Sequence, residues 1–318
     1  MAKIAITGGA GFIGYHLAKH YVALGHDVVC CDSFNDYYDP QLKYARESQL
    51  EGIDGCEILD LTWRESVAKW IYETEPDLVI HLAAYAGVRY SVEYPQKYID
   101  NNIIGTQNLI EACESYGVHK VVYASTSSVM SGNPLPYNEA DNLPHQKHPY
   151  GMTKVANESQ FMGSSIDTTI GLRFFTVYGP WGRPDMALFD FTKKIIAGEP
   201  ITLFNNGDMI RDFTYIDDIV QGVDLVVKNA LNTTLPKKKD IYNIGYGEQV
   251  QLMDFVDHIE KNLGRTAIKE YAPMHPADAH ATWSDTTKLQ KLGYKPTTSI
   301  AEGVEAFVAW YKGYYNVN

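Results

Sequence analysis

The sequence has few cysteines and no long apolar run, and both shortages limit what the protein can be. Four cysteines, at positions 30, 31, 56 and 113, occur among 318 residues, and their spacing matches no metal site. Cysteines placed in this way favour a reducing, cytoplasmic location, and we expect no metal centre. No apolar run reaches the roughly 18 residues that a membrane-spanning helix needs. The opening residues, MAKIAITGGAGFIG, lack the layout of a signal peptide.

Positive charge is also scarce. The chain has 27 lysines and arginines against 39 aspartates and glutamates, which gives a net charge of −12. Nucleic acids and anionic membranes attract basic surfaces, so we expect neither as a partner. The length and the 45% share of hydrophobic residues suit one large α/β unit, or a core domain with a smaller lobe.

Glycine is concentrated in one turn near the N-terminus. Residues 3–7 predict a short strand, and a helix is expected to run from the turn to about Leu24. The turn itself carries Gly8, Gly11 and Gly14. Such a turn lets backbone N–H groups and a helix N-terminus approach a pyrophosphate. The pattern therefore predicts a dinucleotide site, and the alternative is a glycine turn with a structural role alone.

An acidic residue follows the second predicted strand, residues 26–31. Asp32 lies eighteen positions past Gly14. A carboxylate at this place accepts a hydrogen bond from a ribose 2′-hydroxyl and repels a 2′-phosphate. The position of Asp32 therefore favours NAD over NADP.

Strands alternate with helices through the first half of the chain, with further strands predicted near 56–59, 78–82 and 120–124. This alternation predicts an α/β fold with a doubly wound parallel sheet, of the Rossmann type, whose ligands lie at the carboxyl ends of the strands. The residues that we expect beside a cofactor at these ends are Asp60, Leu61, Leu82, Ala83 and Ala84.

The pattern loosens near residue 175. We therefore predict a cofactor-binding domain over residues 1–175, to which later parts of the chain return, and a smaller, interleaved α/β substrate lobe over 176–318. Asn206-Gly207 predicts a tight hairpin turn. Asp217-Asp218 are expected to cap the helix that follows them.

A tyrosine and a lysine stand four positions apart in a predicted helix over residues 150–162. Positions i and i+4 share a helix face, so Tyr150 and Lys154 are neighbours. An ammonium beside a phenol lowers a pKa that starts near ~10, which makes Tyr150 a candidate proton acceptor. The hydroxyl cluster Ser125-Thr126-Ser127-Ser128 follows the strand 120–124 and is expected to hold a substrate alcohol against it. Because the chain has 23 tyrosines, the spacing carries this inference.

These motifs together resemble the extended short-chain dehydrogenase/reductase family of nucleotide-sugar enzymes. Within that family, several long strings are similar to UDP-glucuronate 4-epimerases: SFNDYYDPQLKYAR, AGVRYSVEYP, GLRFFTVYGPWGRPDMALF, RDFTYIDDI and KPTTSIAEGVEAFVAWYKGYY. The resemblance implies an isomerase with bound NAD that interconverts UDP-glucuronate and UDP-galacturonate through a 4-keto sugar without decarboxylation. It also implies a homodimer formed through the helices expected at 95–116 and 150–162. Synthesis of an acidic polysaccharide is the expected use of the product.

The resemblance also implies roles for individual residues. Tyr150 is the expected base, helped by Lys154, and Ser127 binds the sugar 4-hydroxyl beside Thr126. The expected NAD-binding residues are Gly8, Gly11, Phe12, Ile13, Gly14, Asp32, Asp60, Leu61, Leu82, Ala83, Ala84, Ser125, Tyr150 and Lys154. The expected substrate-binding residues are Arg89, Ser127, Ser128, Thr176, Arg183, Arg211 and Asp278, with the arginines at 183 and 211 on the diphosphate and Asp278 on the uridine ribose.

Glucuronate adds a hazard, because its 4-keto form is a β-keto acid that can lose CO₂. We hypothesise that Thr176 and Ser128 hold the carboxylate so that the breaking bond stays out of line with the carbonyl. Family dehydratases carry an Asp-Glu pair after the threonine equivalent to Thr126, and its absence here argues against dehydration. The alternatives that stay open are a UDP-glucose 4-epimerase and a non-catalytic NAD-binding sensor.

One departure from the family stands inside the hydroxyl segment. The family usually has Tyr-Gly after Ser-Ser-Val, whereas this chain has Met130-Ser131. The family aromatic usually lies near the sugar or the nicotinamide, so this departure concerns the shape of the pocket.

Overall fold

Seven parallel strands form the central sheet of the computed structural model, which describes residues 1–233 and 238–317. In chain order the strands are β1 (Lys3–Thr7), β2 (Asp27–Asp32), β3 (Cys56–Ile58), β4 (Leu78–His81), β5 (Lys120–Thr126), β6 (Thr168–Phe174) and β11 (Lys238–Ile244). Their spatial order is β11-β6-β5-β4-β1-β2-β3. The order reverses between β1 and β4, and such a switch point is where open α/β sheets bind ligands.

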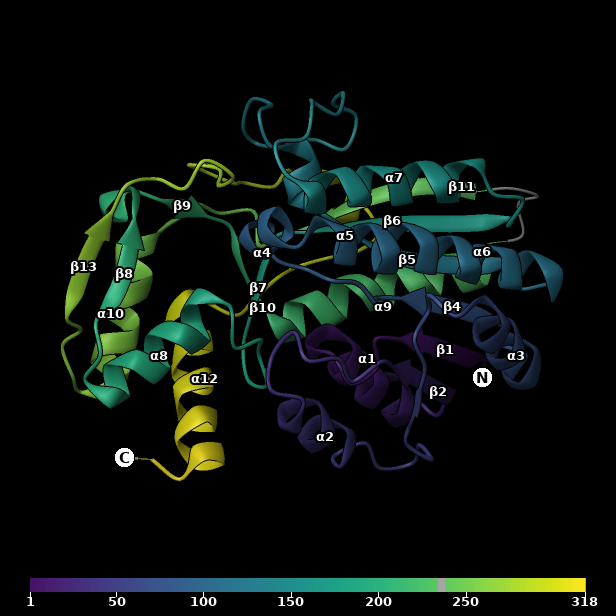
Figure 1. Cartoon of the computed structure of the whole chain (residues 1–318), viewed down its shortest axis with the longest axis horizontal. Helices are drawn as coiled ribbons and strands as arrows, with labels where there is room; N and C mark the ends of the chain where they lie inside the picture. Colours follow the sequence, from purple (N-terminus) through teal and green to yellow (C-terminus); the bar gives the residue numbers. More distant parts are fainter. Residues whose placement is uncertain (234–237, 318) are drawn as a thin grey trace.

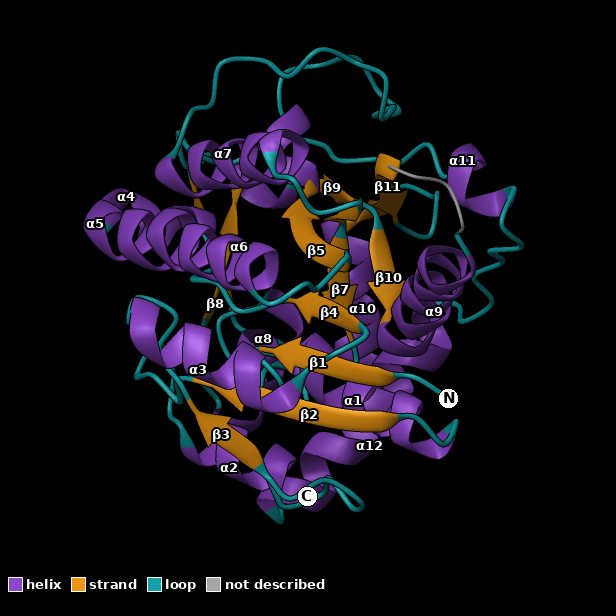
Figure 2. Cartoon of the chain, turned by 90° about the vertical axis from the view of Figure 1, so that its right-hand side faces the viewer, coloured by secondary structure: helices purple, strands orange, loops and turns teal. Residues whose placement is uncertain are grey.

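Helices cover both faces of this sheet, as Figure 2 shows. The helices on one face include α1 (Phe12–Ala23) and α9 (Ile216–Asn232), and those on the other include α3 (Arg64–Thr74), α6 (Gly105–Ser115) and α7 (Pro149–Gly163). Every residue of β4 and β6 is buried. Runs of apolar residues without alternation fit strands that are covered on both faces. The predicted doubly wound α/β fold is therefore confirmed.

A smaller lobe stands beside the sheet, at the left of Figure 1. It contains α8 (Ala187–Ala197), β8 (Ile201–Phe204), α10 (Leu252–Leu263), β13 (Lys269–Ala272) and α12 (Ile300–Tyr315). The long helix α12 packs on α10 and begins with a capping box between Ser299 and Glu302. Between these elements the chain returns to the main sheet as α9 and β11, so the lobe is interleaved with the core.

The remaining elements are short. They are α2 (Gln41–Glu47), α4 (Val88–Glu93), α5 (Pro95–Tyr98), the π-helical segment η1 (Ile99–Ile104), the 3₁₀ turns η2 (Ser127–Met130) and η3 (Asn205–Gly207), β7 (Thr176–Tyr178), β9 (Ile210–Arg211), β10 (Phe213–Tyr215), β12 (Val250–Gln251) and α11 (Thr287–Gln290). The helix expected over 95–116 is thus interrupted by a π-helical segment, a feature often found near functional sites.

Two local predictions are wrong. Asn206-Gly207 do not join a hairpin, because β8 pairs in parallel with β13 while β9 pairs with β12. Asp217 and Asp218 do not cap α9: Tyr215 stands at the cap position, and buried Asp218 accepts from the backbone of Thr297 and Thr298. In both cases a partner distant in sequence outweighs the local signal. The described ranges contain no helix with the length and apolarity that crossing a bilayer requires.

Candidate active site

The carboxyl ends of β1, β4 and β5 border a cavity of about 450 Å³. Nearly all of the predicted site residues line it: Gly8, Gly11, Phe12, Ile13, Gly14, Asp32, Leu61, Leu82, Ala83, Ala84, Ser125, Thr126, Ser127, Ser128, Tyr150, Lys154, Thr176, Arg183, Arg211 and Asp278. Two predicted residues do not. Arg89 lines an adjoining cavity, and the carboxylate of Asp60 accepts from the backbone N–H of Thr62.

The glycine turn has little room for side chains. The Gly8 N–H donates to the Cys31 carbonyl at 2.7 Å, and Gly8 has a φ of +73° that favours glycine. A Cβ on Gly14 would lie 2.1 Å from the Gly8 carbonyl oxygen. Helix α1 begins at Phe12, directly after Gly11, so its N-terminal N–H groups lie at the cavity wall. This arrangement fits a bound pyrophosphate.

A lysine that sequence analysis did not single out accompanies Asp32. The Lys43 ammonium donates to the Asp32 carboxylate at 3.0 Å, and both side chains are buried and line the cavity. The carboxylate therefore carries a counter-charge from α2, which the spacing argument did not include. Lys43 falls in the string SFNDYYDPQLKYAR, so the family resemblance was the only signal for it.

Arg46, also from α2, is fully buried and joins the glycine turn to a distant loop. Its guanidinium donates to the carbonyls of Ala10 at 3.0 Å, Trp181 at 2.8 Å and Gly182 at 3.2 Å. A fork of N–H donors suits such convergent carbonyls. The contacts hold the loop that carries Arg183 beside the glycine turn, and no local pattern predicted them.

Tyr150 stands in the first turn of α7, whose N-terminus is capped by the His148 ring nitrogen accepting from Gly151 N–H at 2.9 Å. Burial raises the pKa of the Tyr150 phenol, while a hydrogen bond with Thr126 and the charge of Arg183 oppose that rise in pKa. The expected lowering of this pKa by Lys154 is therefore not found. The groups that favour the phenolate in this structure are Thr126 and Arg183.

The Lys154 ammonium is engaged by the strand beside it. It donates to the Ala124 carbonyl at 3.0 Å, and its side chain is buried. Burial lowers the pKa of Lys154 to about 8, against the opposing charge of Glu158. The pKa of Lys154 is therefore close to neutral pH. The Ala124 carbonyl of β5 fixes the direction of the Lys154 side chain.

The hydroxyl cluster lies opposite Tyr150, where β5 gives way to η2. Thr126 Oγ1 accepts from the backbone of Ser128 at 3.2 Å, which folds residues 127–130 into a tight turn. Ser127, Ser128 and, from β7, Thr176 border the cavity. Ser125 also borders the cavity, but its hydroxyl donates to Glu158 at 2.6 Å.

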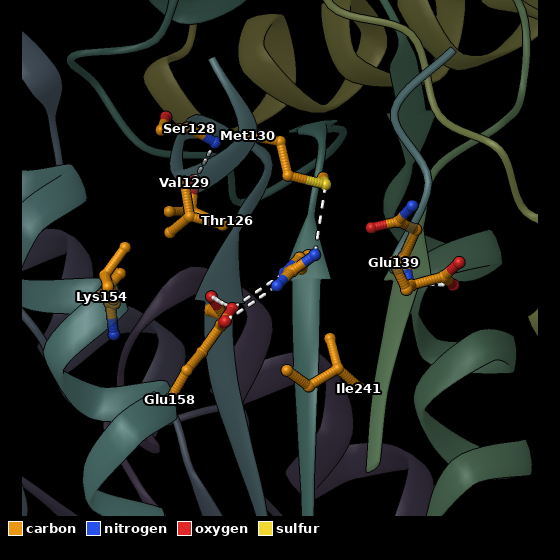
Figure 3. Close-up of polar contacts among 12 residues, drawn as sticks. Thr126, Ser128, Val129, Met130, Glu139, Lys154, Glu158 and Ile241 are labelled. Carbon is orange, nitrogen blue, oxygen red and sulfur yellow. Dashed lines mark hydrogen bonds and ion pairs between the residues drawn. The ribbon is translucent and has the colours of Figure 1, made fainter. Parts of the chain in front are cut away.

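Met130 lies behind the cavity wall. It is fully buried and clusters with Val129, Tyr137 and Phe175, while Ser128 and Ser131 border the cavity. Its sulfur lies 3.3 Å from the Arg173 guanidinium, and a dashed line from Met130 marks this contact in Figure 3. This side chain therefore points towards β6 and does not itself border the cavity.

The charged residues expected at the diphosphate and ribose already have partners within the chain. Arg183 donates to Asp185 at 3.0 Å, and Asp185 also accepts from the Tyr37 hydroxyl at 2.9 Å. Arg211 donates to the His280 carbonyl at 3.0 Å. Both arginines still line the cavity, so they give this end of it a positive wall. Within the described part of the chain, His, Cys, Asp and Glu form no group of three or more suited to a metal ion.

The site brings a glycine turn, a tyrosine–lysine helix and a hydroxyl-bearing strand end together around one cavity. This combination is typical of the class of sugar-nucleotide epimerases and dehydratases. The chain belongs to the NAD dependent epimerase/dehydratase family, whose model matches residues 4–245.

Particular relatives are similar along the whole chain. A "Probable UDP-glucuronate 4-epimerase" from Rhizobium meliloti is 40% identical over 335 residues, with 98% of each chain covered. "Protein CapI" from Staphylococcus aureus is 42% identical, with 98% of this chain and 99% of that one covered. The crystal structure of UDP-glucuronic acid 4-epimerase from Bacillus cereus in complex with UDP-glucuronic acid and NAD superposes with a TM-score of 0.90 at 35% identity. That match covers 98% of this chain and 100% of the other.

Proposed function

We propose that this protein is an NAD-dependent UDP-glucuronate 4-epimerase, which interconverts UDP-glucuronate and UDP-galacturonate through a 4-keto sugar. The observation that carries the proposal is the meeting of three features around one cavity: the glycine turn, the Tyr150–Lys154 helix and the hydroxyl cluster after β5. Whole-length similarity to proteins named for this activity supports it.

The cavity-lining residues from the N-terminal part of the chain fit NAD. Gly8, Gly11 and Gly14 line the cavity at the N-terminus of α1, a place that suits a pyrophosphate, and Asp32 offers a carboxylate to a ribose hydroxyl. We assign to NAD the residues Gly8, Gly11, Phe12, Ile13, Gly14, Asp32, Leu61, Leu82, Ala83, Ala84, Ser125, Tyr150 and Lys154. When bound, NAD supplies the hydride acceptor and donor for the sugar C4 carbon.

Tyr150 is assigned the proton transfer. Its phenolic oxygen takes the proton of the sugar 4-hydroxyl and later returns it, which is general base and general acid catalysis at one atom. Thr126 and Ser127 hold that hydroxyl in place, and Lys154 supplies positive charge from the same helix face. The positive Arg183 beside the cavity adds to the stabilisation of the phenolate.

Ser128 and Thr176 are assigned to the sugar carboxylate. They come from two different elements, η2 and β7, yet both border the cavity. Two hydroxyls on a carboxylate restrict its rotation and keep the bond to C5 out of line with the 4-keto group. Thr176→Val is expected to raise the share of substrate that leaves as CO₂ and a UDP-pentose. An unchanged partition between epimer and pentose contradicts this assignment.

The nucleotide end of the substrate is assigned to four charged residues. Arg183 and Arg211 line the cavity with guanidinium groups suited to a diphosphate, and Asp278 lines it with a carboxylate suited to the uridine ribose. Arg89, from the adjoining cavity, holds Asp278.

Turnover of UDP-glucuronate tests the proposal. Purified protein incubated with UDP-glucuronate is expected to produce UDP-galacturonate, visible by proton NMR, and Tyr150→Phe is expected to lose at least about a hundredfold in rate. A panel of UDP-glucuronate, UDP-glucose and UDP-xylose separates this activity from a UDP-glucose 4-epimerase. Bound NAD without turnover of any of the three would instead indicate a non-catalytic sensor.

We also propose a homodimer in the cytoplasm. Ile104 in η1 and Met152 in α7 are large apolar residues that are exposed on the helices expected to pair. All four cysteines are free thiols, which supports a reducing compartment. We assign the product to the synthesis of acidic polysaccharide.

A further inference from the structure

A buried ionic cluster lies one helical turn beneath the proposed catalytic pair. Glu158 belongs to α7, four positions after Lys154, and its side chain points towards β5 and β6, as Figure 3 shows. Its carboxylate accepts from Arg173 twice, Nε to Oε1 and Nη2 to Oε2, each at 2.9 Å. The Ser125 hydroxyl donates to Oε1 at 2.6 Å. Glu158 and Arg173 are both almost completely buried.

The cluster ties the helix to the end of the strand that carries the hydroxyls. Ser125 and Arg173 are register partners in the β5–β6 pairing, so one carboxylate bridges two neighbouring strands. Lys154 makes the second attachment, through the carbonyl of Ala124. Two adjacent residues of β5 are thus bound by two residues of α7 that are one turn apart. This double attachment joins α7, which carries Tyr150, to the end of β5, which carries Thr126.

Glu158 is also the negative charge that acts on Lys154. Among the described residues, it is the group whose charge opposes the effect of burial on the pKa of Lys154. His81, from β4, lies near the ammonium, but burial lowers the pKa of His81 to about 3, so its ring is neutral. Tyr123, from β5, lies near Glu158, and burial raises the pKa of that phenol, so it stays uncharged. Arg173, from β6, is paired with Glu158 itself.

We propose that Glu158 is a positioning residue for the reaction: it keeps the Lys154 ammonium charged, while its bond to Ser125 holds the hydroxyl cluster against Tyr150. The inference rests on the proposed use of Tyr150 and Lys154. A structural role alone would be that of an ordinary buried ion pair, whose loss destabilises a fold and does nothing specific to Lys154.

The test compares three variants. Glu158→Gln removes the charge but keeps the shape, and Glu158→Asp keeps the charge. The double variant Glu158→Gln with Arg173→Gln removes both charges, so Arg173 is not left buried and unpaired. Each is assayed for thermal unfolding, for NAD affinity by calorimetry from pH 6 to pH 9, and for the pH dependence of kcat and KM with UDP-glucuronate.

In the wild type, NAD affinity is expected to fall as Lys154 loses its proton, around pH 8. Glu158→Gln is expected to move this fall in NAD affinity, the alkaline limb of the pH profile, to a pH lower by about one unit. The reason is that a nearby opposite charge shifts a pKa by that order. kcat is expected to follow the same shift, with KM changing less. Glu158→Asp is expected to keep the wild-type limb. The double variant is expected to recover thermal stability but to keep the shifted limb, because it also lacks the Glu158 charge.

Two results overturn the proposal. One is that NAD affinity falls at the same alkaline pH as in the wild type, either in folded Glu158→Gln or in the double variant, while only the stability is reduced. The other is a double variant that recovers both stability and the limb, since the effect would then come from an unpaired Arg173. Calorimetry with NAD distinguishes failure of the proposed function from failure of the role of Glu158. A wild type without epimerase activity contradicts the proposed function, while the pH dependence of NAD affinity still tests the effect of Glu158 on Lys154.

Discussion

The guanidinium of Arg89 donates to the carboxylate of Asp278 at 2.6 Å, although 189 positions separate the two residues. The Arg89 guanidinium also lies 3.6 Å from the centre of the Phe204 ring. Both residues were expected to bind the substrate. The pair shows that a residue of α4 holds a residue of the loop between β13 and α11, and both border the adjoining cavity.

Arg89→Met is expected to weaken binding of the UDP-sugar and to leave the chemical step nearly intact. Loss of the arginine frees the Asp278 carboxylate, whose direction the ribose contact requires. A charged hydrogen bond of this kind corresponds to about a tenfold change, so KM is expected to rise about tenfold with kcat within about twofold. Steady-state kinetics measures both. Arg64→Met, which removes a surface pair with Glu111 far from the cavity, is the matched control; equal effects of both variants contradict the prediction.

Lys43→Met is expected to weaken NAD binding and to destabilise the protein. The substitution leaves the buried Asp32 carboxylate without its cation, and breaking a buried pair in this way costs about 3 kcal/mol. Chemical unfolding measures the stability, and calorimetry is expected to show NAD affinity reduced by at least about tenfold. Lys69→Met, which removes an exposed pair with Glu73, serves as the control. Full NAD affinity in Lys43→Met would show that Asp32 needs no counter-charge.

Met130→Tyr restores the family aromatic and is expected to harm stability rather than substrate choice. The site is fully buried and lies behind the cavity wall, so a larger ring overpacks it at a cost of about 1–3 kcal/mol. The ratio of kcat/KM between UDP-glucuronate and UDP-glucose is expected to stay within about twofold. Met130→Leu, which conserves volume, is the control. A changed ratio with unchanged stability would mean that this side chain reaches the substrate.

His81→Asn is expected to flatten the acid dependence of stability. The pKa of His81 is about 3 in the folded protein, because burial disfavours its charged form, and about 6.5 in the unfolded chain. Its contribution is present above pH 6.5 and is lost as the pH falls towards 3, because the unfolded state binds the extra proton. Between pH 7 and pH 5 this amounts to about 2 kcal/mol. Urea unfolding at both pH values should show that the variant loses less free energy of unfolding between pH 7 and pH 5 than the wild type does, by that amount. The control His145→Asn, at an exposed position, should lose as much as the wild type.

Contacts between distant segments account for the features that pattern reasoning missed. The glycine turn was predicted because strand, turn and helix are adjacent in sequence and obey local geometry. The Lys43 and Arg46 contacts were not, because each side chain reaches its partner through the fold. Arg46, for example, joins Ala10 to Trp181. The pKa of Tyr150 was misjudged for the same reason: burial, a tertiary property, raises it, and the groups that oppose the rise are Thr126 and Arg183 rather than the neighbour on the same helix.

The amino-acid sequence by itself determined the order of strands and helices, the dinucleotide turn and the tyrosine–lysine pair, because these depend on periodicity and on residues within a few positions of one another. Only the tertiary structure decided that Met130 faces Arg173, that Asp32 is paired with Lys43 and that Glu158 joins the catalytic helix to two strands. Side-chain direction, burial and charge pairing depend on segments that come together only when the sheet and its helices assemble. No local sequence pattern predicts them.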